Sequence, residues 1–194
     1  MIFCCHNNKL YIFKDSNQSI YSSVEELPIN QESLFLFDNC RNTKYIHNLA
    51  YTYYEGEEIE EPDLEGDKAE FIINSNIEEQ ASLIDRKVAQ LINEEGIEAK
   101  DISVIVLDNY DTAKKLLEKS RNKKNWAFKA LSPQNKVLVE TAKRFKGLES
   151  NIIFLWILDS SNMSDKMLYV SISRARFRLF IVGDEGIRSI DEGQ

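Results

Sequence analysis

Three short segments carry arginines in positions where they could act on a phosphate group. Arg41 lies between an apolar run and an amphipathic stretch, Arg174 lies just before the last apolar run, and the basic segment 141–149 ends in Lys-Gly-Leu-Glu. A guanidinium suits the charge that spreads over a transferring phosphoryl group, and such arginines can come from outside the domain that holds the phosphates. Taken singly, each arginine is better explained as a surface ion-pair residue, which contributes under about 1 kcal/mol.

The sequence lacks the motifs of a self-sufficient nucleotide hydrolase or metalloenzyme. It contains no Gly-x-x-x-x-Gly-Lys-Ser/Thr loop, which would cradle nucleotide phosphates, and no acidic pair placed to hold Mg²⁺ after such a loop. The 2 histidines, His6 and His47, have no partner at metal-ligand spacing, and none of the 3 cysteines forms a Cys-x-x-Cys pair. We therefore expect His47, inside a predicted helix, to be a surface or packing residue.

Charge is distributed unevenly along a chain whose net charge is −8. Residues 1–111 hold 8 Lys and Arg against 23 Asp and Glu, residues 112–182 hold 15 against 5, and residues 183–194 hold 1 against 4. The overall charge argues against a free-standing nucleic-acid binder, because neutralising phosphates requires Lys and Arg. The basic part predicts either an anion-binding face or simply a solvated helix surface around residues 114–124.

The order of apolar stretches predicts the elements that must position these arginines. Strands are expected at residues 9–13, 34–37, 71–73, 102–107, 136–139, 152–158 and 177–182. Helices are expected at about 44–54 after Thr43, from Asn76 to Gly96, from Asp111 or Thr112 to Leu117, and at 164–175. Strands that alternate with helices indicate an α/β fold with a parallel sheet and helices on both faces. Since open parallel sheets bind ligands at the carboxyl ends of their strands, Arg41 is expected at that edge.

Length and composition limit the class of protein. The 194 residues suffice for one α/β domain, or one domain and a fragment of a second. No run approaches the roughly 18 apolar residues of a membrane-spanning helix, so no membrane partner is expected. The first residues have no basic region before their apolar ones, so a secretory signal is not expected, and the cysteine usage favours a cytoplasmic protein.

Read in order, these segments resemble the C-terminal motor domain of UvrD/Rep-like superfamily 1 DNA helicases. Asp15 to Tyr21 (DSNQSIY) resembles motif III and Asn39 to Thr43 (NCRNT) resembles motif IV. Thr141 to Glu149 (TAKRFKGLE) resembles motif V, and Leu168 to Arg176 (LYVSISRAR) resembles motif VI. The family often has an aromatic residue at the position of Cys40, and it often has histidine at the position of Lys143.

The resemblance implies a RecA-like, P-loop NTPase-like fold without its own Walker A loop. Residues 30–190 would form the second RecA-like domain, and residues 1–23 would be the tail of the first motor domain. The implied residue roles are as follows: Arg41 and Arg174 reach the γ-phosphate of ATP, Gln18 couples that phosphate to DNA, Glu149 contacts the ribose, Gly147 allows close backbone approach, and Thr141 and Lys143 meet the DNA backbone.

The function expected from the resemblance is that of the C-terminal motor domain of an ATP-dependent DNA helicase, which needs a separate N-terminal motor domain to bind ATP. ATP and Mg²⁺ would bind in the intact parent enzyme and not to this chain alone, so the isolated chain is expected to be inactive. Its partners would be single-stranded DNA and the N-terminal motor domain. The alternative is a degenerate helicase domain that acts as a non-enzymatic interaction module for nucleic acid or protein. A domain that binds a small anion would need a Gly-rich strand-to-helix turn, which the sequence lacks.

Overall fold

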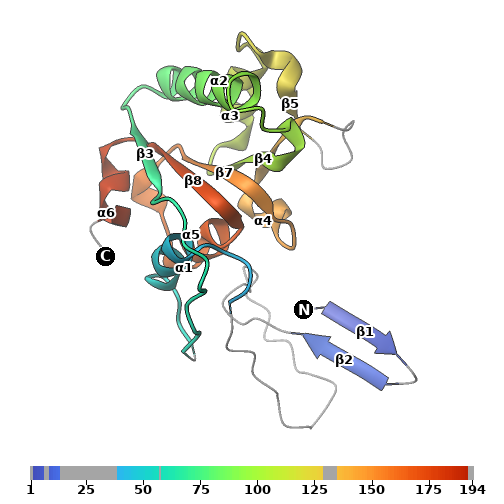
Figure 1. Ribbon diagram of the computed structural model, residues 1–194. Helices are drawn as coiled ribbons and strands as arrows, with labels where there is room; N and C mark the ends of the chain where they lie inside the picture. The colour runs from blue at the N-terminus through green and yellow to red at the C-terminus, as the bar shows by residue number, and fades with distance from the viewer. Residues whose placement is uncertain (1, 7–8, 14–38, 57, 129–134, 192–194) are drawn as a thin grey trace.

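The computed structural model describes residues 2–6, 9–13, 39–56, 58–128 and 135–191 (Figure 1). Two amino-terminal strands, β1 (Ile2–His6) and β2 (Lys9–Phe13), pair antiparallel in a sheet of their own. The predicted strand at 9–13 is therefore confirmed. Gln18 and the strand predicted at 34–37 lie outside the described residues, and the division of the chain at residues 1–23 and 30–190 stays a prediction.

A parallel sheet of six strands forms the centre of the fold, in the order β3-β8-β7-β4-β6-β5. The strands are β3 (Glu70–Ile73), β4 (Ile102–Leu107), β5 (Trp126–Ala127), β6 (Val137–Thr141), β7 (Ser150–Ile157) and β8 (Ala175–Gly183). In the middle of the sheet, Val106 of β4 pairs with Thr141 on one side and with Trp156 on the other. In this register, Thr141, Val106 and Trp156 lie side by side at the same height along three neighbouring strands.

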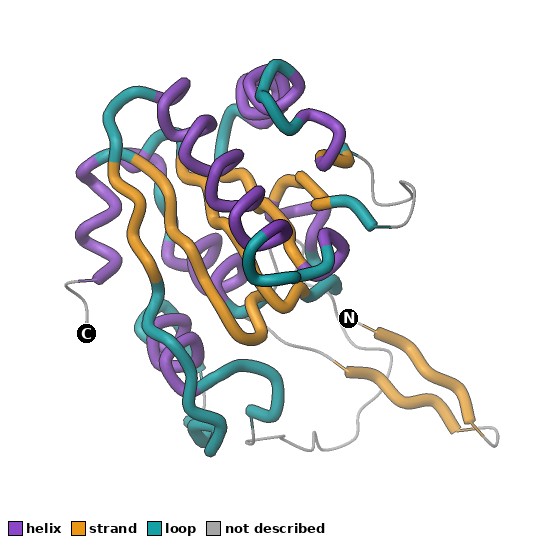
Figure 2. Tube along the Cα trace, turned by 45° about the horizontal axis from the view of Figure 1, so that its top comes forward, coloured by secondary structure: helices purple, strands orange, loops and turns teal. Residues whose placement is uncertain are grey.

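Helices cover both faces of this sheet, as Figure 2 shows. The helices are α1 (Lys44–Tyr51), α2 (Ile77–Asn93), α3 (Tyr110–Glu118), α4 (Ala142–Phe145), α5 (Asp165–Ile172) and α6 (Arg188–Asp191). Helices α2 and α3 contribute to one hydrophobic core, whereas α1, α4, α5 and α6 contribute to the other. Four single turns of 3-10 helix complete the described elements: η1 (Ala99–Asp101), η2 (Lys123–Asn125), η3 (Ser160–Asn162) and η4 (Glu185–Ile187). None of the helices in these ranges has both the length and the hydrophobicity needed to cross a membrane.

Strand β7 shows why the sequence has long apolar runs. Its alternate side chains enter different cores: Phe154 and Trp156 pack with α2 and α3, whereas Leu155 and Ile157 pack with α1 and α5. A strand covered on both faces needs apolar residues at every position, because successive side chains point to opposite faces. The polar indole nitrogen of Trp156 is satisfied by donating to Gln80 Oε1 on α2, at 2.7 Å.

Helix starts were predicted better than helix ends. Asn76 caps α2 by accepting a hydrogen bond from the Glu79 amide at 2.9 Å, as its spacing predicts. The helix predicted at 164–175 is wrong at its end, because α5 stops at Ile172 and β8 already begins at Ala175, which pairs with Ser150. The two-residue β5 and the four-residue α4 were not predicted, since such short elements carry no readable periodicity.

Candidate functional site

The turn that carries Arg41 is attached to the amino end of β8. The Asn42 side-chain amide donates to the backbone carbonyls of Ser173, at 3.1 Å, and Ala175, at 2.5 Å. The Thr43 amide donates to the carbonyl of Arg176 at 3.1 Å. Since Asn42 is only 4% exposed, these are buried hydrogen bonds between segments far apart in the sequence. They bring Arg41 next to the Ser173–Arg174 turn.

Asn39 shapes the turn itself. Its Oδ1 accepts hydrogen bonds from the Arg41 amide at 2.9 Å and from the Asn42 amide at 3.4 Å. Its Nδ2 donates to Asn42 Oδ1 at 3.0 Å. Asparagine side chains commonly bond to backbone groups two residues on, in what is called an Asx-turn. The residue types around Arg41 therefore define the course of the backbone that presents it.

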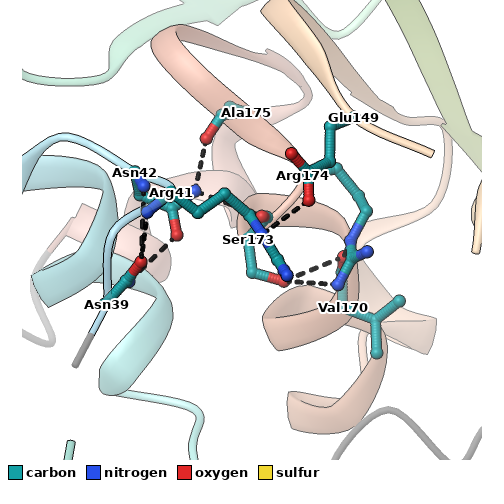
Figure 3. A network of polar contacts seen from close by, with 8 residues as sticks. All are labelled: Asn39, Arg41, Asn42, Glu149, Val170, Ser173, Arg174 and Ala175. Carbon is teal, nitrogen blue, oxygen red and sulfur yellow. Dashed lines mark hydrogen bonds and ion pairs between the residues drawn. The ribbon is translucent and has the colours of Figure 1, made fainter. Parts of the chain in front are cut away.

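The Arg41 side chain crosses to the loop that precedes β7 and meets Glu149 there (Figure 3). The distance between Arg41 Nε and Glu149 Oε1 is 2.5 Å, and the two side chains are 41% and 34% exposed. Gly147, in the same loop, has φ of +85°, a backbone conformation that L side chains rarely adopt. The Leu148 amide closes the loop by donating to the carbonyl of Phe145 at 2.9 Å. Arg41 and Glu149 thus form one surface site, and Gly147 belongs to the loop that carries Glu149.

Arg174 lies in the same place but is buried, with 3% exposure. Its Nε donates to the carbonyl of Val170 at 3.0 Å, and its Nη2 donates to Ser173 Oγ at 3.3 Å. These partners belong to the last turn of α5 and its cap, where the partial negative charge of the helix end favours a cation. The Arg174 carbonyl also accepts a hydrogen bond from the Ser150 amide at 3.1 Å, which attaches this turn to the start of β7. Of the two arginines, Arg41 is the one that reaches solvent.

The prediction that Arg41 lies at the carboxyl ends of the strands is wrong. Its neighbours Glu149 and Arg174 directly precede β7 and β8, so the site lies at the amino ends of these strands. The physical reason is the attachment of the turn: Asn42 and Thr43 bond to the first residues of β8, and these contacts override the general rule for open sheets.

Thr141 and Lys143 lie at the opposite end of the strands, where β6 ends. Thr141 ends β6 and caps α4, accepting a hydrogen bond from the Arg144 amide at 3.3 Å, and Lys143 is exposed. Through β4, Thr141 is level with Trp156, whereas Glu149 lies just before the first residue of β7. At about 3.3 Å per residue, the two groups are separated by roughly 20 Å along the strands. The site residues implied by the resemblance that lie within the described ranges therefore form two groups, connected by α4 and the loop 146–149.

His47 was expected to be a surface or packing residue, and it is a buried residue of α1 with 5% exposure. Its Nδ1 lies 2.7 Å from Nδ2 of Asn39, and its ring stacks on Tyr51 with centroids 5.5 Å apart. Burial lowers the pKa of the imidazole, and the nearby Glu61 carboxylate only partly opposes this shift.

Sequence reasoning missed Asn39, Asn42 and His47 as supports of Arg41. The one available signal was the pair of asparagines on either side of the arginine, since asparagine favours turns. In the same described ranges, Cys40 is an exposed free thiol, and no group of three or more His, Cys, Asp or Glu residues could hold a metal ion.

Comparisons with known proteins agree with this architecture. The structure resembles the C-terminal domain of a possible DNA helicase from Lactobacillus plantarum WCFS1, at 17% identity and a TM-score of 0.59, over 74% of this chain and 86% of that one. This likeness confirms the RecA-like fold class. The DNA complex of an arterivirus helicase, nonstructural protein 10, matches at 10% identity and a TM-score of 0.41, over 73% of this chain and 30% of that one. The curated proteins include no match. Residues 8–186 match the family described as AAA domain, and because this range is most of the polypeptide, the chain belongs to the AAA domain family.

Proposed function

We propose that this chain is the second RecA-like motor domain of an ATP-dependent DNA helicase of the UvrD/Rep-like superfamily 1. It would work with an N-terminal motor domain that carries the phosphate loop. The AAA domain match and the shared fold with a helicase C-terminal domain support this proposal. The observation that carries it is the convergence of three distant segments, which brings Arg41, Glu149 and Arg174 together at the amino ends of β7 and β8.

Arg41 is the better placed of the two arginines to act on ATP. Its side chain is 41% exposed, and among the described residues it pairs with Glu149, whose side chain is 34% exposed. A γ-phosphate delivered by the other motor domain would compete with Glu149 for the guanidinium. Glu149 would then be available to accept a hydrogen bond from a ribose hydroxyl. This exchange of partners would stabilise charge on the transferring phosphoryl group, an effect worth about 10³ to 10⁵ in rate for arginines of this kind.

Arg174 would stabilise the Ser173 turn to which the Arg41 turn is attached. Its guanidinium bonds to Val170 and Ser173, and the same Ser173 offers its carbonyl to Asn42 in the Arg41 turn. To touch a phosphate, Arg174 would have to exchange the Val170 carbonyl for the phosphate oxygen. Mg²⁺ would be held by the other motor domain, since the described part of this chain offers no cluster of acidic ligands for it.

Single-stranded DNA would bind on the opposite edge, at Thr141 and Lys143. The exposed Lys123 and Lys124 of η2 directly precede β5, whose Trp126 pairs with Val137 at the start of β6. They lie at the other end of the sheet from Thr141 and are not part of this surface. Helix α4 begins at the Thr141 cap, and the loop that follows it ends at Glu149. A movement of Glu149 on nucleotide binding would therefore reach Thr141 and Lys143 through α4 and the loop 146–149. Closure on ATP and opening after hydrolysis would shift the grip on the strand.

ATP turnover tests the proposal. The purified chain alone should not hydrolyse ATP with or without single-stranded DNA, and turnover by this chain would refute the half-motor assignment. In an enzyme that contains both motor domains, R41A should lower kcat by about 10³-fold or more. R86A, which removes an exposed arginine of α2, serves as the matched control and should leave kcat unchanged.

The alternative is a non-enzymatic nucleic-acid interaction module, favoured by the 15 Lys and Arg against 5 Asp and Glu in residues 112–182. It predicts salt-sensitive binding of single-stranded DNA by the chain alone, with a log–log slope set by the phosphates contacted. The motor domain predicts weak binding by the isolated chain, because the net charge is −8. Fluorescence anisotropy at several salt concentrations separates the two functions.

A further inference from the structure

We infer that His47, in its neutral form, is a positioning residue for Arg41 and acts on it through Asn39. The catalytic consequence of this inference rests on the proposed function of Arg41. The hydrogen bonds behind it lie within the described chain and can be tested without any assumption about activity.

The orientation of the Asn39 amide is determined by its neighbours. Its oxygen must face the backbone amides of Arg41 and Asn42, because both are donors, at 2.9 and 3.4 Å. Its nitrogen therefore faces Asn42 Oδ1 at 3.0 Å and His47 Nδ1 at 2.7 Å. If the amide were flipped, its nitrogen would face the backbone amides of Arg41 and Asn42, which are also donors. Its oxygen would then face Asn42 Oδ1, which is also an acceptor.

This orientation determines the tautomer of His47. Since Asn39 Nδ2 can only donate, Nδ1 of His47 must accept, and the imidazole proton must be on Nε2. A protonated imidazole carries a proton on both nitrogens and would oppose one donor to another. Protonation of His47 would thus break the contact with Asn39 and loosen the side chain that holds the Arg41 backbone.

The surroundings of the imidazole favour the neutral form. The ring is 5% exposed and stacks on Tyr51 of α1, whose ring stacks on Tyr54, which in turn contacts Tyr169 of α5. Among the described charged groups, Glu61 acts on the imidazole, and it is paired with Lys44 at 2.7 Å. Burial outweighs Glu61, so the pKa of His47 is lowered and the ring is neutral near pH 7.

The role of this contact is to restrict the Arg41 turn before a phosphate arrives. A guanidinium on a turn that is already ordered loses less conformational freedom on binding and is held closer to the reactive geometry. Neither Asn39 nor His47 contacts the phosphate in this scheme, so both act only through Arg41.

The tautomer can be measured directly by NMR, because the chain has only 2 histidines. Long-range ¹H–¹⁵N spectra of the chain and of H6Q, which leaves a single imidazole, assign the His47 signals. We expect an unprotonated Nδ1 and a protonated Nε2 at pH 7. A proton on Nδ1 at that pH overturns the inference.

Two matched variants separate the hydrogen bond from packing. H47Q keeps an oxygen that can accept from Asn39, whereas H47F keeps a ring against Tyr51 but has no acceptor. Amide hydrogen exchange at Arg41 and Asn42 should become about tenfold faster in H47F, the size of one lost hydrogen bond, and stay near the wild-type rate in H47Q. Equal exchange rates in the two variants, or no increase in H47F, overturn the inference.

The pH profile of kcat in the enzyme with both motor domains gives the functional readout. The wild type should lose rate only at a pH lower than the ordinary histidine pKa of about 6.5, because burial lowers the pKa of His47 in the folded chain. H47Q should lack this acidic limb, because glutamine does not titrate. The same limb in H47Q overturns the inference without affecting the proposed function. An R41A enzyme with wild-type turnover instead refutes the proposed function, while the NMR results still decide whether His47 positions Arg41.

Discussion

The guanidinium of Arg41 forms an ion pair with the carboxylate of Glu149, with 2.5 Å between Nε and Oε1. The pair joins the turn before α1 to the loop before β7, and a third or more of each side chain remains exposed. An accessible ion pair of this kind holds both groups in place and still allows either to change partner. The proposed role of these two residues in nucleotide binding rests on this pair.

The first prediction concerns the contribution of this pair to folding. E149Q should lower the free energy of unfolding by less than about 1 kcal/mol, because exposed ion pairs contribute little. The loss should be larger at about 0.01 M salt than at about 1 M, where charges are screened within a few ångströms. Urea unfolding at both salt concentrations measures this. E98Q, which removes the carboxylate of another exposed ion pair, that with Lys100, is the control and should give a loss of similarly small size. A loss that does not depend on salt would contradict the ion-pair assignment.

The second prediction concerns the backbone of the Glu149 loop. G147A should destabilise the fold by about 1–2 kcal/mol, because φ of +85° is costly for a residue with a Cβ. A Cβ at this position would meet no atom within 4 Å, so the cost comes from the backbone and not from a clash. G147N should cost less, since asparagine tolerates left-handed conformations. Urea unfolding of both variants provides the measurement, and equal losses would show that backbone conformation is not the cause.

The third prediction concerns the attachment of the Arg41 turn. N42A should lower the free energy of unfolding by about 1–3 kcal/mol, because it leaves the buried carbonyls of Ser173 and Ala175 without this donor. N48A, at an exposed position of α1, is the control and should stay within about 0.5 kcal/mol of the wild type. If thermal or urea unfolding gave the two variants equal stability, the contacts of Asn42 would not be what holds the turn.

The fourth prediction is a pH dependence of stability that arises from His47. Burial lowers the pKa of this imidazole in the folded chain below the ordinary 6.5, so the unfolded chain binds the proton more readily. Stability therefore rises with pH wherever the unfolded state holds more protons, and it falls as pH drops below about 6.5. The wild type should lose stability relative to H47Q between about pH 7.5 and pH 5.5. Urea unfolding across this range tests the sign, and a constant difference between the two proteins would contradict it.

Several features of the fold and the site were readable from the sequence. Strand β4 is apolar at every position except Ser103, the cap of α2 follows from Asn76 and Glu79, and the alternation of strands and helices gave the fold class. These signals are local, because propensity, capping and side-chain period act over a few neighbouring residues. The sequence also indicated that Arg41, Glu149 and Arg174 could act on a nucleotide. It did not indicate that they lie at the amino ends of the strands.

What the amino-acid sequence determined by itself is therefore the set of elements and the chemical character of the arginine-bearing segments. The tertiary structure decided that Arg41 lies at the amino ends of β7 and β8, that Thr141 lies at the other edge, and that His47 is buried behind Asn39. These placements depend on hydrogen bonds such as that from Asn42 to Ser173, across 131 positions of the chain. Such bonds form only when strands far apart in sequence pair in register, and no local pattern encodes that register.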